Sequence, residues 1–397
     1  MAPPKRQPVR EEDLEGFRML RPLQTLLAQL HGVGCDRDKA GTRDFFMDHY
    51  MVLLLLAMFN PICRSVHGLC QASSLGKVRR TLGVPRVSLG SFSEAGGVFD
   101  ADAIKPLLAS LACKVQLRKD APGLAAFRDS LTAVDGTFFR DLPRVVQALW
   151  TDDDPPAFKA HVQDEILKGV AVDALVTDGR ASEKRVLESR LQPGRLYVAD
   201  QGYQKYALMQ AILDADSSFI IRIAPTAVQR LVQDRPLTEA ARAAGVRSDR
   251  IVWLGSRGRD QALRRPLRVR EVEVTEMTAK RLRARRKGLQ PGDRLWIVTD
   301  RFDLDADLVA LLYRQRWSIE IFFRMFKHLL GCSHLLSHQA NGIQLQVYAA
   351  MLACLLIVLY TGRKPNRRTL EMVAWYLTGW ASDAELRAHL DKLPPQA

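Results

Sequence analysis

The residues best suited to chemistry lie between Tyr313 and Lys327, where one carboxylate is surrounded by cations and a phenol. The stretch has no Gly or Pro, and its polar residues recur at helical intervals, so it predicts an α-helix. At about 100° per residue, one stripe of that helix carries Tyr313, Arg316, Glu320, Arg324 and Lys327. A Glu among phosphate-binding side chains suits metal-assisted phosphoryl transfer on a nucleic acid. The alternative is a surface helix with solvated charges.

Two upstream acids share a sequence context. Asp135 and Asp200 each follow an apolar run typical of a strand, and each is followed within two residues by Gly. Such a pattern after a strand is ordinarily a turn, which is the alternative for Asp135. Three carboxylates that converge raise one another's pKa unless cations neutralise them. Their hard oxygen atoms suit Mg²⁺ or Mn²⁺ rather than zinc.

The spacing of Tyr313, Arg316, Glu320 and Lys327 resembles the signature around the last acidic residue of DDE transposases of the insertion-sequence-four family. The run from Asp200 to Tyr203 resembles the family's second acidic motif. The resemblance implies that Asp135, Asp200 and Glu320 are the catalytic residues and hold two Mg²⁺ or Mn²⁺ ions. It also implies that Tyr313, Arg316 and Lys327 grip DNA phosphates and that Trp296 contacts DNA. Arg324, which lies on the same helix stripe, is a further candidate for DNA contact.

Trp296 resembles a family aromatic that stacks on a flipped base when a DNA hairpin forms. A Trp in an alternating strand is otherwise a core residue, and Trp253 is the competing candidate. Other acids could replace Asp135 at the metal site. These are Asp152, Asp153 and Asp154, which resemble a solvated loop, and Asp178 and Asp300, which resemble strand-end turns.

The function implied by the resemblance is cut-and-paste transposition. Each end of an insertion sequence would be cut at its terminal inverted repeat, and the released 3′ hydroxyl would attack another phosphodiester. The partners would be double-stranded terminal repeats and target DNA, with a homodimer assembled on DNA. Two alternatives stay open: a catalytically silent, domesticated DNA-binding protein, and a nuclease of the same fold that does not join strands.

Composition agrees with a polyanionic partner. The 397 residues include 58 Lys and Arg against 44 Asp and Glu, a formal net charge of +14. This excess by itself does not separate DNA, RNA and an anionic membrane. The six cysteines form no CxxC pair and fit a reduced, cytoplasmic (nucleoid-associated) protein. The apolar runs 51–59 and 347–360 are shorter than the roughly 20 residues of a membrane span, so we expect buried helices and no membrane partner.

The order of predicted elements defines the fold class. Strands and helices between residues 131 and 223 follow the order βββαβαβ, and a helix at 305–330 completes them. We expect an α/β protein with a ribonuclease-H-like core, a mixed five-stranded sheet with helices, although the strand order and fold name depend on the resemblance. A β-rich insertion is expected to interrupt the core, and an all-helical N-terminal region to precede it.

The expected domains follow from these changes in texture. They are a disordered basic tail (1–10), a helical N-terminal domain that binds DNA ends (11–125), the first segment of the catalytic core (126–223), the basic β-rich insertion (224–303), the second segment of the catalytic core (304–362) and a helical tail (363–397). In the N-terminal domain, Lys77, Arg79, Arg80 and Arg86 are candidates for phosphate contact, and packing on the core is the alternative. The tail either packs or mediates self-association.

Overall fold

The structure is a computed structural model. It describes residues 8–14, 16–17, 20, 25–63, 65–115, 130–139, 158–255, 263–274, 290–330, 335–337, 339–362 and 367–392. The first seven residues of the tail, the basic tract 280–287 and Asp152 to Asp154 lie outside these ranges.

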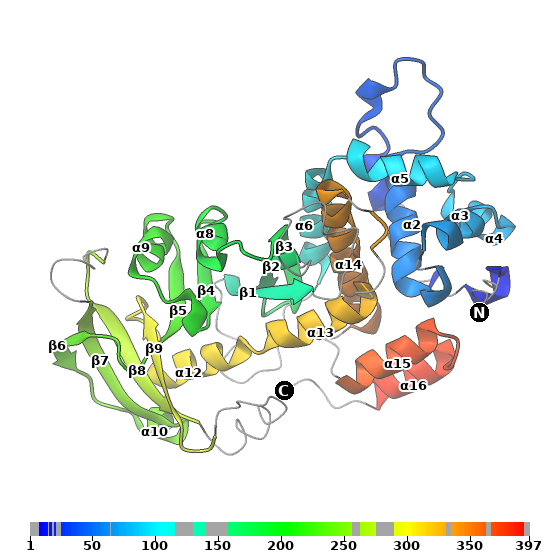
Figure 1. The fold of residues 1–397 in the computed structure, drawn as a ribbon. Helices are drawn as coiled ribbons and strands as arrows, with labels where there is room; N and C mark the ends of the chain where they lie inside the picture. The colour runs from blue at the N-terminus through cyan, green and yellow to red at the C-terminus, as the bar shows by residue number, and fades with distance from the viewer. Residues whose placement is uncertain are drawn as a thin grey trace, which may run out of the picture.

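A nine-stranded sheet, in the order β3-β2-β1-β4-β5-β9-β8-β7-β6, forms the frame of the molecule (Figure 1). Its first five strands are β1 (Ser130–Phe139), β2 (Phe158–Glu165), β3 (Val170–Asp178), β4 (Arg195–Ala199) and β5 (Ser218–Ile223). β1, β4 and β5 are parallel, while β2 and β3 are antiparallel to their neighbours. This mixed sheet with its helices fits a ribonuclease-H-like core.

The segment 224–303 continues the core sheet. It contributes β6 (Gln229–Asp234), β7 (Val246–Leu254), β8 (Leu267–Glu273) and β9 (Arg294–Thr299), with the short helix α10 (Glu239–Ala243). β9 pairs antiparallel with β5, and Ile223 lies opposite Trp296. Backbone hydrogen bonds therefore join the β-rich segment to the core. Sequence periodicity missed β6, whose residues are mostly exposed and do not alternate.

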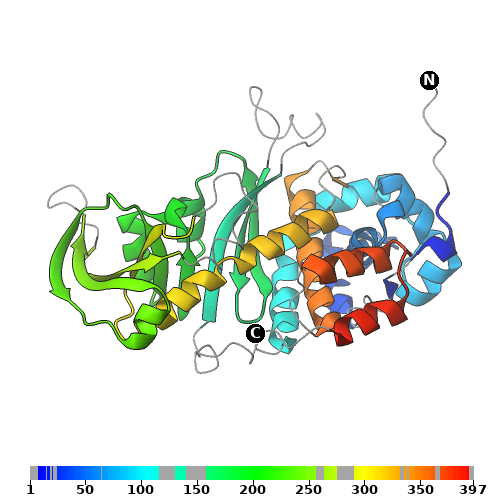
Figure 2. The same cartoon turned by 90° about the horizontal axis from the view of Figure 1, so that it is seen from below.

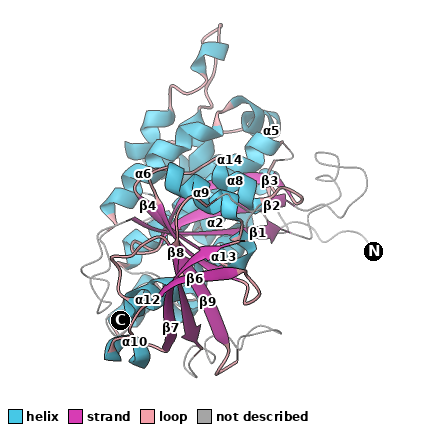
Figure 3. Cartoon of the chain, turned by 90° about the vertical axis from the view of Figure 1, so that its left-hand side faces the viewer, coloured by secondary structure: helices cyan, strands magenta, loops and turns pink. Residues whose placement is uncertain are grey.

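Helices cover the sheet and fill the N-terminal half, as Figures 1 and 3 show. The N-terminal helices are α2 (Met47–Phe59), α3 (Val66–Ser73), α4 (Gly76–Leu82), α5 (Leu89–Val98) and α6 (Lys105–Lys114). Short 3-10 turns are η1 (Glu11–Asp13), η2 (Ala28–Leu30), η3 (Cys35–Arg37), η4 (Pro61–Cys63), η5 (Ala101–Ile104) and η7 (Gln201–Tyr203). The core helices are α8 (Glu183–Glu188), α9 (Tyr206–Asp214), α12 (Ala306–Gln315), α13 (Ser318–Leu330) and α14 (Ala340–Thr361).

Helix α14 is the centre of the helical core. Among the described residues it alone is long and apolar enough to cross a membrane, yet 89% of its most apolar stretch is buried inside the protein. It packs against α2, α5, α13 and β3. The Tyr348 hydroxyl donates to the Ala174 carbonyl of β3, 3.1 Å away, and ties the helix to the sheet.

The adjacent glycines Gly96 and Gly97 predict a break between helices, but both lie inside α5, so this prediction is wrong. The run from Ser91 to Glu94 likewise predicts a helix start, but the capping side chain is Ser88, whose hydroxyl accepts the Ser91 amide. A Cβ on Gly96 would stand 3.3 Å from the Gly342 Cα. Glycine is needed here because α5 and α14 approach closely, and not because the chain turns.

The helix expected over 305–330 is broken in two. α12 ends at Gln315 and α13 begins at Ser318. Between them each backbone amide donates to the carbonyl three residues earlier, and not four as in an α-helix. The Arg316 amide donates to Tyr313, and the Glu320 amide donates to Trp317. A 3-10 turn advances about 120° per residue, so Glu320 is rotated relative to Tyr313 from its place on the predicted single stripe.

The C-terminal tail folds as α15 (Arg367–Leu377) and α16 (Asp383–Asp391) and packs on the helical half (Figure 2). Tyr376 and Leu377 belong to the large hydrophobic core. Trp375 and Trp380 stay 51% and 84% exposed. The tail therefore packs, and its role in self-association stays a prediction.

The contact between α5 and α14 can be tested with Gly342→Ala. The added Cβ would stand 2.1 Å from the Ser337 Oγ, so neighbouring backbone must shift. We expect the free energy of unfolding to fall by about 1 to 3 kcal/mol, measured by denaturant titration. Gly90→Ala is the control, because its Cβ would meet only the Ser88 Oγ at 3.8 Å. A Gly342→Ala protein as stable as the control would contradict the close approach.

Candidate functional site

Asp135 lies inside β1 and not at its end. The strand continues to Phe139 and stays paired with β2, so the expected strand end at Asp135 is wrong, and so is the alternative of a turn there. The Gly136 amide donates to the Asp135 Oδ1, 2.8 Å away. The Asp135 side chain is 24% exposed. A carboxylate in the middle of a sheet has its direction fixed by the strand.

Asp200 follows the last residue of β4, as the sequence predicted. β4 pairs in parallel with β1, and Ala133 lies opposite Val198. Asp135 and Asp200 each come two residues later, so the same register brings these two acids side by side. The Asp200 Oδ1 accepts the Gly202 amide at 2.8 Å. A Cβ on Gly202 would stand 2.9 Å from that oxygen, which accounts for the Gly two residues after the acid.

Glu320 reaches the same place from α13, which packs against β1. The link is Arg316, in the break between α12 and α13. Its Nη1 lies 4.0 Å from the Asp135 Oδ2, and its Nη2 lies 3.7 Å from the Glu320 Oε1. Burial lowers the pKa of Arg316, but Tyr313 and the charges of Asp135, Asp200 and Glu320 together raise it above its ordinary value. Arg316 thus faces all three predicted carboxylates.

The site carries more negative charge than Arg316 neutralises. Burial raises the pKa of Asp135 to about 7, and the carboxylates of Asp200 and Glu183 add to the rise while Arg316 opposes it. Burial and the nearby charges of Glu183, Asp135 and Asp200 hold the pKa of the Tyr203 phenol well above its ordinary value. Excess charge on hard oxygen donors fits a divalent cation such as Mg²⁺ or Mn²⁺.

The other residues of the predicted stripe are not equally accessible. Tyr313 is buried, and the Arg316 side chain is 8% exposed, so Arg316 serves the carboxylates in this conformation. Arg324 is exposed and Lys327 half-buried further along α13. Figure 2 shows α13 running from the sheet toward the helical half. Arg324 and Lys327 are therefore better placed for a polyanion than Tyr313 and Arg316.

Trp296 lies in β9, between β5 and β8, and is half-buried against the second hydrophobic core cluster. Trp253 lies in β7, with the Arg230 guanidinium 5.8 Å from its ring centre. Both rings therefore have partners within the sheet. Base stacking by Trp296 stays a prediction.

The alternative acids have structural partners. The Asp178 Oδ1 accepts the Arg180 amide at 2.8 Å, as in a turn. The Asp300 Oδ1 accepts the Phe219 amide at 2.8 Å, and its Oδ2 pairs with Arg265 at 3.1 Å. Neither replaces Asp135 beside Arg316.

The proposed phosphate contacts of the N-terminal region differ among themselves. The Lys77 ammonium donates to the Glu11 carbonyl at 3.0 Å and to the Leu14 carbonyl at 3.3 Å, so Lys77 secures the N-terminal segment. Arg79, Arg80 and Arg86 are exposed and remain candidates.

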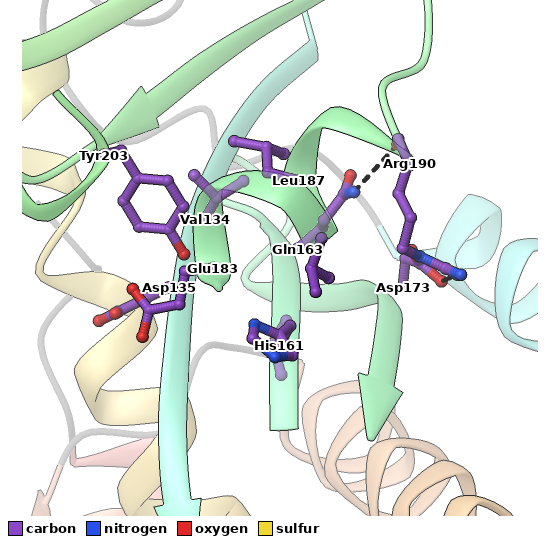
Figure 4. Close-up of a pocket in the computed structure, with 11 residues that line it drawn as sticks. Val134, Asp135, His161, Gln163, Asp173, Glu183, Leu187, Arg190 and Tyr203 are labelled. Atoms are coloured by element: carbon purple, nitrogen blue, oxygen red, sulfur yellow. Dashed lines mark hydrogen bonds and ion pairs between the residues drawn. The ribbon is translucent and has the colours of Figure 1, made fainter. Parts of the chain in front are cut away.

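The sequence reasoning missed Glu183. This acid, in the first turn of α8, lines a pocket with Asp135, His161 and Tyr203 (Figure 4). The Tyr203 hydroxyl points toward the two carboxylates. The Lys159 Nζ lies 2.5 Å from the Glu183 Oε1. An acid in the first turn of a helix is ordinary, so the sequence offered no specific signal for it.

The mixed sheet and the acidic side chains near Arg316 are compatible with a nucleic-acid-processing fold. Residues 126–356 match the family described as "Transposase DDE domain". This match covers more than half of the chain, and the chain belongs to that family.

Two curated relatives agree. A protein of Sinorhizobium fredii assigned as the transposase y4zB is 32% identical over 187 residues, 47% of each chain. One of Geobacillus stearothermophilus, assigned as the transposase of insertion sequence element IS5377, is 24% identical over 278 residues, 69% of this chain and 68% of its own. The match thus spans about half the length of the first relative.

Among solved structures, a piggyBac transposase synaptic complex with hairpin DNA aligns at a TM-score of 0.40 and 10% identity, over 98% of this chain and 88% of its own.

The charge imbalance makes a pH-dependent prediction. Between about pH 4 and pH 7 the unfolded chain loses the Asp135 proton while the folded protein keeps it, since burial raises the pKa of Asp135 from 3.8 to about 7. The free energy of unfolding therefore falls as pH rises through this window, because the unfolded chain is stabilised by losing the proton. In chelator at pH 8, Asp135→Asn should raise the free energy of unfolding by about 1 to 3 kcal/mol. The gain should shrink toward pH 4.

Denaturant unfolding at several pH values measures this difference. The control is Asp36→Asn, at an exposed acid, and should change stability little at any pH. An Asp135→Asn protein no more stable than wild type at pH 8 would contradict the assigned charge imbalance.

Proposed function

We propose that this chain is a DNA transposase that moves an insertion sequence by cut-and-paste. The observation that carries the proposal is the meeting of Asp135, Asp200 and Glu320 around Arg316, from three separate segments of the chain. Membership of the transposase DDE family supports it. The spacing from Tyr313 to Lys327 favours the insertion-sequence-four group within that family.

In the proposed reaction, Asp135, Asp200 and Glu320 hold two Mg²⁺ or Mn²⁺ ions. Such ions supply activation of the attacking oxygen and charge stabilisation at the leaving 3′ oxygen. β1 and β4 fix the directions of two carboxylates, and α13 brings the third. Arg316 holds the carboxylates together by offsetting part of their repulsion.

The proposed DNA cleavage and joining steps need no covalent bond between protein and DNA. Water first attacks the phosphodiester at the element end, which leaves a 3′ hydroxyl and a 5′ phosphate. The 3′ hydroxyl then attacks a second phosphodiester, forms a new 3′ to 5′ bond and releases another 3′ hydroxyl. Arg324 and Lys327 bind phosphates beside the site, with Tyr313 and Arg316 joining them after rearrangement, and Trp296 stacks on a base. Such a protein works in the cytoplasm on the nucleoid.

The DNA partner agrees with a formal net charge of +14. Cutting two ends together needs two active sites, so we propose a homodimer assembled on the terminal repeats. A domesticated DNA-binding derivative is the second candidate. The presence of all three carboxylates in one neighbourhood favours the active enzyme.

Replacing Glu320 with Gln tests the reaction. The variant keeps the side-chain shape but removes a negative charge, so Mg²⁺-dependent nicking at cognate inverted repeats should fall about a thousandfold or more. Binding to the same DNA ends should persist in a gel-shift assay. Glu188→Gln, on an exposed face of α8, is the matched control and should cut normally.

Retained nicking by Glu320→Gln would refute the assignment. A strand-transfer assay on supercoiled target separates transposase from nuclease, because a nuclease would cut the ends without joining them.

Arg324→Gln tests the phosphate contact. Loss of one phosphate contact should lower the slope of log affinity against log salt by about 1. Fluorescence anisotropy of labelled element ends between low and moderate salt measures the slope. Lys392→Gln, at the exposed end of α16, is the control for lost positive charge. Equal slopes for the two variants would place Arg324 outside the DNA interface.

A further inference from the structure

An ion pair is built against the strand that carries Asp135. The Lys159 side chain of β2 is 9% exposed and the Glu183 side chain of α8 is 24% exposed, with 2.5 Å between Nζ and Oε1. Glu183 and Asp135 line the same pocket. The two carboxylates are close enough for the charge of Glu183 to act on Asp135. Figure 4 shows the Glu183 and Asp135 carboxylates below the Tyr203 ring.

Gly136 makes room for this pair. A Cβ on Gly136 would stand 2.6 Å from the Glu183 Oε1 and 2.8 Å from the Lys159 Cε. Gly136 lies within β1, and it is not among the described glycines with positive φ. The Gly after Asp135 is therefore explained by space for the ion pair rather than by a turn.

Stability alone is a poor explanation for such a pair. Taking two charges out of water costs free energy that their attraction often fails to offset, and apolar side chains of similar size frequently stabilise a protein more. Placing Glu183 beside Asp135 also adds a repulsion. A role for Glu183 at the adjacent carboxylates accounts for both the desolvation of the ion pair and the repulsion from Asp135.

We propose that Glu183 is a fourth carboxylate of the site, a positioning residue that Lys159 holds in place and whose charge strengthens binding of a divalent cation. This inference rests on the proposed function. Fully ionised, the carboxylates of Asp135, Asp200, Glu320 and Glu183 exceed the cations Arg316 and Lys159 by two negative charges. This excess favours binding of divalent cations. Without Glu183 the excess would be halved.

The test is Mn²⁺ binding by the full-length chain, followed as the rise in melting temperature during a Mn²⁺ titration. Glu183→Gln removes the charge and keeps the side-chain size. Mutating a residue that supports metal ligands typically lowers metal affinity by 10- to 100-fold. We therefore expect the half-saturating Mn²⁺ concentration to rise about tenfold in Glu183→Gln. The Mg²⁺ concentration for half-maximal DNA cleavage should rise in parallel.

Glu271→Gln is the matched control. Glu271 of β8 is also little exposed and pairs with Arg294 at 2.6 Å, but it lies in the β-rich segment. This variant should keep the wild-type Mn²⁺ midpoint. If Glu183→Gln does not fold, Glu183→Asp serves, because a side chain one methylene shorter withdraws the carboxylate from Asp135. Its Mn²⁺ midpoint should also rise.

A purely structural pair would lower the melting temperature without Mn²⁺ and leave the Mn²⁺ midpoint unchanged, and that result would overturn the proposal. Asp135→Asn distinguishes failure of the proposed metal site from failure of the proposed role of Glu183. If it raises the midpoint and Glu183→Gln does not, only the role of Glu183 fails. If wild type shows no Mn²⁺ binding, the proposed carboxylate centre fails as well.

Discussion

Repulsion among half-buried carboxylates is the constraint on which this structure depends. Asp135 and Asp200 are adjacent because β1 and β4 run parallel in a fixed register, and Glu320 faces the same guanidinium from α13. Arg316 offsets only some of the charge, so burial and neighbouring acids leave the pKa of Asp135 at about 7. A fold optimised for stability alone would not gather these groups. The sheet register, the helix break and the two glycines beside the acids all serve to hold them together.

The break between α12 and α13 follows from the same constraint. A continuous helix would place Arg316 and Glu320 one turn apart on one face. The tighter turn changes the rotation between them, and the buried guanidinium lies within 4.0 Å of both Asp135 and Glu320. A stretch of 3-10 turn within a helix often marks a functional position. The Ser318 hydroxyl, which donates to the buried Asp164 Oδ2 at 3.2 Å, anchors the start of α13 to β2.

The sequence predicted the elements that depend on local pattern. Sequence pattern predicts strands at 158–166, 218–223 and 294–299, and these match β2, β5 and β9 nearly to the residue. Residue types at fixed spacing are what made Asp200 and Glu320 candidates. Sequence pattern failed where distant packing decides. Gly96 and Gly97 suggested a break because nothing local reveals the approach of α14, and Asp135 with Gly136 suggested a turn because the crossing ion pair is contributed by β2 and α8. Glu183 was missed because its significance comes only from its position in space.

The continuity of the sheet bears on how the β-rich segment acts. Because β9 is hydrogen-bonded to β5, Trp296 sits opposite Ile223, and β5 in turn pairs with β4, the strand directly before Asp200. Only two strand spacings, roughly 10 Å, separate the β4 and β9 backbones across the sheet. The position of Trp296 relative to the carboxylates is therefore set by backbone pairing within one sheet. If Trp296 stacks on a base as we propose, the same pairing sets the distance between that base and the carboxylates.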